Sequence, residues 1–75
     1  MNKKRRERIS KAVNSLEEIL TIMEEILDEE QDAYDNMPEN LQSSMRAEES
    51  EEAIETLDEA MENLSSAVDA LSEIC

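Results

Sequence analysis

Two runs of neighbouring carboxylates are the side chains in this chain that could carry out chemistry. Carboxylates at such spacing bind Mg²⁺ or act as general acids and bases. The chain has no histidine and one cysteine, so the commonest general base is missing and a zinc site is excluded. The first run comprises Glu24, Glu25 and Asp28, and the second comprises Glu48, Glu49, Glu51 and Glu52.

Both runs resemble the magnesium-binding carboxylates of all-helical nucleotide pyrophosphohydrolases, a resemblance that would imply magnesium-dependent turnover in a helical-bundle dimer. Here no base-stacking aromatic accompanies them, and the acids lie largely outside the apolar face of their helices. Residues 28–39 repeat the acid spacing of an EF-hand calcium loop, but Ala33 stands where that loop needs glycine. We therefore predict no enzymatic activity, no cofactor and no metal site, with the magnesium enzyme as an alternative.

The formal charge of −14 is distributed unevenly along the 75 residues. Residues 1–11 contain six of the seven basic residues and one acid, a net charge of +5, whereas residues 12–75 carry −19. We expect one small domain over residues 1–75, whose first helix begins with this basic tip at 1–11. Such charge asymmetry indicates an electrostatic partner.

Apolar residues recur at alternating steps of three and four in two segments, which predicts two helices that must carry the carboxylates. In the first helix, expected over about 3–34, the a and d positions are Ile9, Val13, Leu16, Leu20, Met23, Leu27 and Tyr34, with Glu30 as a polar interruption. In the second, expected over about 38–74, they are Ile54, Leu57, Met61, Leu64, Val68, Leu71 and Cys75. The neighbouring g positions are also apolar: Ala12, Ile19, Ile26 and Ala33, then Ala53, Ala60, Ala67 and Ile74.

A single turn signal, residues 35–40, separates the two helices. Asn36 suits a left-handed C-cap, and Pro38 suits the first position of a new helix. Beyond this turn the heptad pattern slips before it becomes regular. Ser43 or Ser44 could cap a restarted helix there, but we favour one continuous helix.

A short turn makes the helices antiparallel neighbours, so the sequence predicts an all-α two-helix hairpin. The expected pairing places Leu20 near Ala53 and Ile54, and Val13 near Met61. A lone hairpin of this size is marginally stable, and its wide apolar stripe needs a second surface. We expect a homodimer that forms a four-helix bundle or coiled coil, or else a partner protein that completes the core. The expected core or dimer residues are Val13, Leu16, Ile19, Leu20, Met23, Ile26, Leu27, Ile54, Leu57, Met61, Leu64, Val68 and Leu71.

The acidic helix surfaces are a second candidate interaction site. Along helices about 48 Å long, the −19 of residues 12–75 gives one charge per roughly 2.5 Å, against about 1.7 Å in duplex DNA. This density favours a nucleic-acid mimic that occupies a basic groove of another protein, although charged faces more often only keep a protein in solution. The expected partner-binding residues are Glu24, Glu25, Asp28, Glu48, Glu49, Glu52 and Glu55, with Tyr34, Met37 and Leu41 at the turn.

The segment Tyr-Asp-Asn-Met-Pro-Glu-Asn-Leu-Gln at residues 34–42 is followed by a Glu-rich stretch at 48–57. These segments resemble small acidic helical proteins encoded by bacteriophages and prophages of Gram-positive bacteria. The resemblance implies an accessory protein that interacts with host or replication factors, such as a counter-defence inhibitor of the anti-CRISPR type. The resemblance implies no catalytic residues.

Together these features predict a non-enzymatic interaction or inhibitor protein whose acidic helical surface binds a protein partner with a basic, nucleic-acid-binding groove. The alternative is a structural adaptor that docks a helical partner through its apolar a/d/g stripe. No apolar segment approaches the roughly 20 residues that span a bilayer, and no apolar h-region follows the basic start. We therefore expect a cytoplasmic location in the bacterial host, with no direct binding to nucleic acid or membrane.

Overall fold

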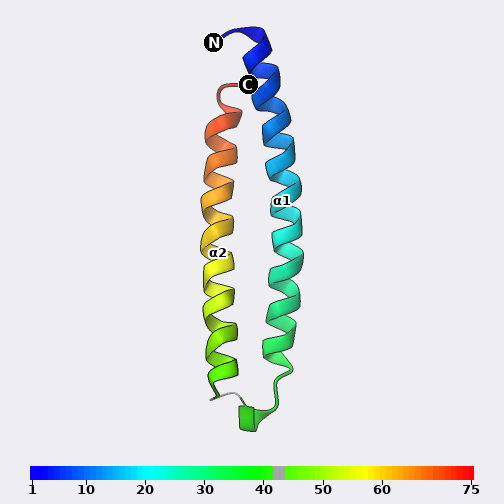
Figure 1. Ribbon diagram of the computed structural model, residues 1–75, viewed down its shortest axis with the longest axis vertical. Coiled ribbons are helices and arrows are strands. Elements are labelled where there is room, and N and C mark those ends of the chain that lie inside the picture. Colours follow the sequence, from blue (N-terminus) through cyan, green and yellow to red (C-terminus); the bar gives the residue numbers. More distant parts are fainter. Residues whose placement is uncertain (42–43) are drawn as a thin grey trace.

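Two long helices lie side by side and antiparallel in the computed structural model, which describes residues 1–41 and 44–75 (Figure 1). Helix α1 spans Lys3–Asp35 and helix α2 spans Met45–Ser72, with a short 3-10 helix, η1, at Glu39–Leu41 between them. The backbone spans 59 × 15 × 13 Å, so the molecule is a single layer two helices wide. The predicted all-α hairpin is confirmed. No helix in the described ranges has the length and apolar content that crossing a membrane requires.

A serine cap, rather than the proline, starts the second helix. Oγ of Ser44 accepts a hydrogen bond from the backbone N of Ala47 at 3.4 Å, and α2 begins at the next residue, Met45. The prediction of one continuous helix from about residue 38 is therefore wrong, because Pro38 leads only into η1. The side-chain cap satisfies one of the free N–H groups of a helix start at Ser44. Ser43, the other predicted cap, lies outside the described residues.

The first helix ends without a left-handed residue. Asn36 has φ −91° and ψ 4°, so the prediction of a left-handed cap is wrong. Its side-chain Nδ2 and its backbone N both donate to the carbonyl oxygen of Asp32, at 2.8 and 3.0 Å. These bonds satisfy a carbonyl group at the helix end. Across the described residues no φ is positive, so the chain turns without the conformation that glycine would provide.

Two side-chain hydrogen bonds near the turn join the helices. Oγ of Ser50 donates to Oε1 of Glu30 at 2.6 Å. The hydroxyl of Tyr34 donates to Oε1 of Glu51. Glu30, the polar interruption of the first heptad pattern, therefore has a polar partner on α2, and the two bonds fix the register of the helices.

The register sets which apolar residues meet. Equal rises along both helices, counted from the bond between Ser50 and Glu30, bring Leu20 level with residues 60–61 and Val13 level with residues 67–68. The predicted neighbours, Ala53 for Leu20 and Met61 for Val13, are wrong by about two helical turns. The cause is the late start of α2, which moves every residue of that helix towards the turn.

The core is one shallow seam between the helices. Val13, Ala47, Ser50 and Val68 are the buried residues among those described, and the other a and d positions from 9 to 34 and from 54 to 71 are half-buried. Ala47 and Ser50 continue the heptads of α2 backward from residue 54, so the predicted slip of the pattern is wrong there. Cys75, the last a position, is exposed.

Replacement of the polar pair in this seam should stabilise the hairpin. We expect Glu30→Leu combined with Ser50→Ala to raise the free energy of unfolding by about 1 kcal/mol, because the pair becomes buried apolar surface. Ser50→Ala alone should lower it, because the half-buried Glu30 carboxylate then loses its partner. Urea denaturation followed by circular dichroism, at one fixed chain concentration, measures both changes. A Ser50→Ala variant more stable than the wild type would contradict this explanation.

Candidate interaction surface

The a/d seam divides the hairpin into two long faces. In an antiparallel helix pair the g positions of both helices flank the seam on one side, and the e positions flank it on the other. Ala33 and Arg46, both g positions, line the same hollow at the turn end, whereas Tyr34 reaches Glu51, an e position. We call the side formed by e and b positions the acidic face, and the side formed by g and c positions the apolar face.

On the acidic face, carboxylates occupy ten of the fourteen e and b positions between residues 12 and 69 of the two helices. All ten of its acids are exposed, and from residue 12 to residue 69 its e and b positions contain no basic and no aliphatic residue. Like charges at these spacings destabilise a helix, so the hairpin gives up some stability to hold this surface. Its members are Glu17, Glu24, Asp28, Asp35, Glu48, Glu51, Glu55, Asp58, Glu62 and Asp69.

The seven predicted partner-binding acids are all exposed, but they lie on different faces of the hairpin. The predicted set lacks six members of the acidic face: Glu17, Asp35, Glu51, Asp58, Glu62 and Asp69. Their positions in the heptad, e or b on each helix, are the signal that could have found them. Of the predicted acids, Glu24, Asp28, Glu48 and Glu55 lie on the acidic face, Glu25 and Glu52 lie on its outer edges, and Glu49 lies on the apolar face.

Tyr34 joins the two helices at the turn end of the acidic face. Its ring is half-buried, and its hydroxyl donates to Glu51. This hydrogen bond raises the pKa of Tyr34 above its ordinary value of 10.0, and desolvation and the charges of Glu51 and Asp35 add to the effect. Tyr34 therefore holds the helices together, and its contact with a partner stays a prediction.

Met37 and Leu41 line one hollow at the turn end of the hairpin. Met37 is half-buried and Leu41 is exposed. This hollow has a volume of about 370 Å³ and also contains Arg46. Tyr34, the third predicted contact residue of the turn, is not among the residues that line this hollow. Gln42, the last residue of the 34–42 motif, lies outside the described residues.

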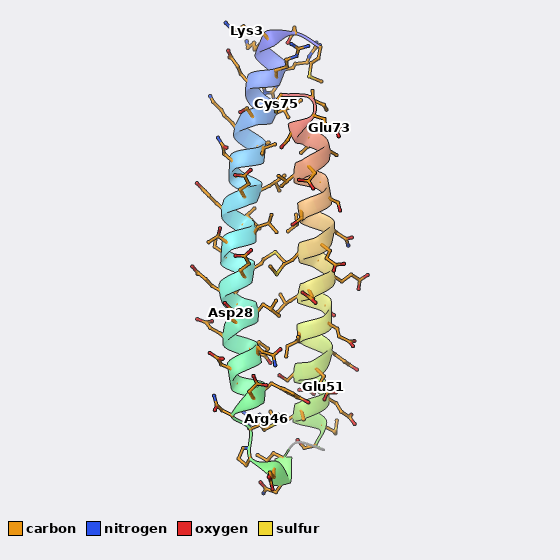
Figure 2. All side chains as sticks on the ribbon, turned by 180° about the vertical axis from the view of Figure 1, so that it is seen from behind. Lys3, Asp28, Arg46, Glu51, Glu73 and Cys75 are labelled. Carbon is orange, nitrogen blue, oxygen red and sulfur yellow. The ribbon has the colours of Figure 1, made fainter. Side chains whose placement is uncertain are left out.

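The basic tip extends past the end of α2. Figure 2 shows Lys3 beyond Glu73 and Cys75, with Arg46 and Glu51 at the opposite end of the molecule. The basic residues of the tip are exposed. A second hollow, of about 340 Å³, lies here against residues 1–12, so each end of the hairpin has a hollow and the two ends differ in charge.

No cluster of three acidic, histidine or cysteine side chains suited to a metal ion occurs among residues 1–41 and 44–75. Compared with protein-family models, curated proteins and solved structures, the chain matches none of them. Its function is therefore inferred from the two faces and the two ends of the hairpin.

The ionisation of Tyr34 should report its bond to Glu51. Tyr34 is the only aromatic residue of the chain, so phenolate absorbance titrates it alone. Because folding raises its pKa, the stabilisation is complete below pH 10 and is lost as the pH rises from there through the raised value. Glu51→Gln should lower the absorbance midpoint towards 10.

Glu52→Gln is the matched control for this titration. It removes the same charge from the next residue, which has no hydrogen bond to Tyr34, so the midpoint should stay near that of the wild type. An unchanged midpoint in Glu51→Gln would show that the bond is absent in solution.

Proposed function

We propose that this protein is a non-enzymatic interaction protein whose acidic face occupies a basic, nucleic-acid-binding groove of a partner protein. The observation that carries the proposal is the acidic face itself, with ten exposed carboxylates and no basic residue among them from residue 12 to 69. A groove that binds nucleic acid presents Lys and Arg to phosphates. A row of carboxylates offers these Lys and Arg side chains the same negative charge that the phosphates would.

The spacing of the charges supports a mimic of a nucleic-acid strand. Helix α2 has 28 residues and is therefore about 42 Å long. Ten carboxylates over this length give one charge per roughly 4 Å, close to the 3.4 Å per phosphate along one DNA strand. The backbone of the hairpin spans 15 Å at most across its two short dimensions, so the molecule is a narrow rod, a shape that suits a groove rather than a flat surface.

The setting that we propose is the cytoplasm of a Gram-positive bacterium that carries a phage or prophage. The resemblance of residues 34–42 to phage proteins supports this setting. In it, an acidic protein that blocks a nucleic-acid-binding groove would act as an inhibitor, for example of a defence nuclease of the CRISPR type.

Salt and competing DNA should both weaken the complex. The tagged full-length chain captures partners from a Gram-positive lysate, and mass spectrometry identifies them. With one purified partner, the affinity should fall at least about tenfold between 0.1 M and 1 M salt, because the Debye length shrinks from about 10 Å to about 3 Å. Excess duplex DNA should displace the protein. A complex that is indifferent to both salt and DNA would rule the proposal out.

Charge reversal on the acidic face should abolish this binding. We expect Glu24→Lys, Asp28→Lys and Glu55→Lys together to lower the affinity by at least about a hundredfold, because close charge pairs contribute strongly at such interfaces. The control reverses Glu18, Asp32 and Glu59 at the outer edges, with the same change in net charge. Equal losses in both triple variants would mean that only the net charge matters.

A structural adaptor is the second candidate function. It is favoured by Ile19, Ile22 and Ile26, which are 43 %, 54 % and 45 % exposed on the apolar face. In that case a helical partner would dock on the isoleucines. Ile22→Asp would then abolish partner capture, and reversal of the acidic face would leave it intact.

A further inference from the structure

The apolar face is the other surface of this hairpin that calls for an explanation. Ile19, Ile22 and Ile26 form one exposed row on α1 at spacings of three and four. Across the seam, α2 presents small residues at its g positions, among them Ala60 and Ala67. The g and c positions at 12–26 and at 53–74 contain no charged residue, in a chain with 21 acids.

We propose that a second copy of the chain covers this face, antiparallel to the first, so that the two hairpins form a four-helix bundle. Hairpins of this size rarely gain enough stability from one seam, and a bundle buries the positions that a two-helix layer leaves in water. A second hairpin has the same length as the face, so it covers the uncharged stretch from end to end.

The charges at the two ends select both the occupant and its direction. The end formed by residues 1–15 and 67–75 has six basic and three acidic residues, a net charge of +3. The end formed by residues 24–58 has a net charge of −13. In an antiparallel pair, the +3 end of each copy lies over the −13 end of the other copy. In a parallel pair, the two −13 ends would lie over each other and repel. A second copy thus supplies the complementary charge that another helical protein would have to provide.

The two hollows fit this arrangement because both open on the apolar face. Arg5 and Arg8, at g and c positions, line the hollow at the tip, and Arg46 lines the one at the turn. A two-fold axis across the middle of the face brings the tip of one copy to the turn end of the other. There Arg5 and Arg8 meet a region in which Glu29 and Glu49 occupy c positions. The acidic faces point outward, so this dimer is independent of the function proposed above.

The mass of the full-length chain in solution tests the dimer. Sedimentation equilibrium should give twice the chain mass, and the midpoint of thermal unfolding should rise with chain concentration. Ile22→Asp should shift the mass towards the single chain. Met45→Asp, which removes an apolar side chain that is 77 % exposed and lies off the apolar face, should leave the dimer intact.

Three results would overturn the dimer. One is a single-chain mass at all concentrations, which would leave the face to a different partner. Another is an unfolding midpoint independent of concentration, a readout that holds even if Ile22→Asp fails to fold. The last is dissociation caused equally by Met45→Asp and Ile22→Asp.

A spin label on Cys75 tests the direction. Cys75 is the single cysteine and is exposed, so each chain carries one label. In the antiparallel pair the labels should lie about 40 Å apart, roughly the length of α2. In a parallel pair they would lie within about 20 Å, two interhelical spacings. A short distance in the dimer would overturn the antiparallel arrangement.

A charge swap within one chain gives an independent readout of direction. Arg5→Glu with Arg8→Glu should raise the dimer dissociation constant about tenfold, because like charges then meet across the interface. Adding Glu29→Lys and Glu49→Lys to the same chain should restore the original value, since the tip and the turn end are again opposite in charge. Failure of the four-residue swap to restore dimerisation would count against the antiparallel pair.

Discussion

Two helices side by side can bury only the positions that face each other, and the other features of this hairpin depend on that constraint. With four buried residues among those described, the seam supplies little apolar area, so polar contacts near the turn matter more than they would in a larger core. The bonds from Ser50 to Glu30 and from Tyr34 to Glu51 set the register. A half-buried carboxylate in an a/d seam would be a defect in a deep core, but here it has a partner and lies close to water.

The heptad pattern was sufficient to predict the helices and the seam, because apolar spacing is a property of the sequence alone. It failed between the helices. Ala47 and Ser50 are too small and too polar to stand out as heptad residues, yet both are buried. The serine cap at Ser44 then decided the start of α2, against the preference of Pro38 for a helix start. Cap choice is a local competition between nearby hydrogen-bonding groups, and periodicity does not resolve it.

The wrong start predicted for α2 also limited how much of the candidate surface could be predicted. The abundance and exposure of the acids followed from composition, but the face that each acid occupies depends on the register of α2 at its first turns. Without the heptad running back through Ala47, the sequence could not separate Glu49 from Glu51, which lie on opposite faces. The bond between Tyr34 and Glu51 depends on the same register across the turn, so it could not be predicted either.

Segregation of residue types is what separates a functional surface from a merely soluble one. Solubility alone would be served by acids at any exposed position, and an acid among Ile19, Ile22 and Ile26 would also hide an apolar patch. Instead, the chain places ten acids on one face and keeps charge away from the middle of the other, although each choice destabilises a lone hairpin. Repulsion within the acidic face and exposed isoleucines on the apolar face are tolerable together if each face has an occupant. A dimer formed through the apolar face would hold two acidic faces outward on opposite sides, and each would be free to meet a basic groove.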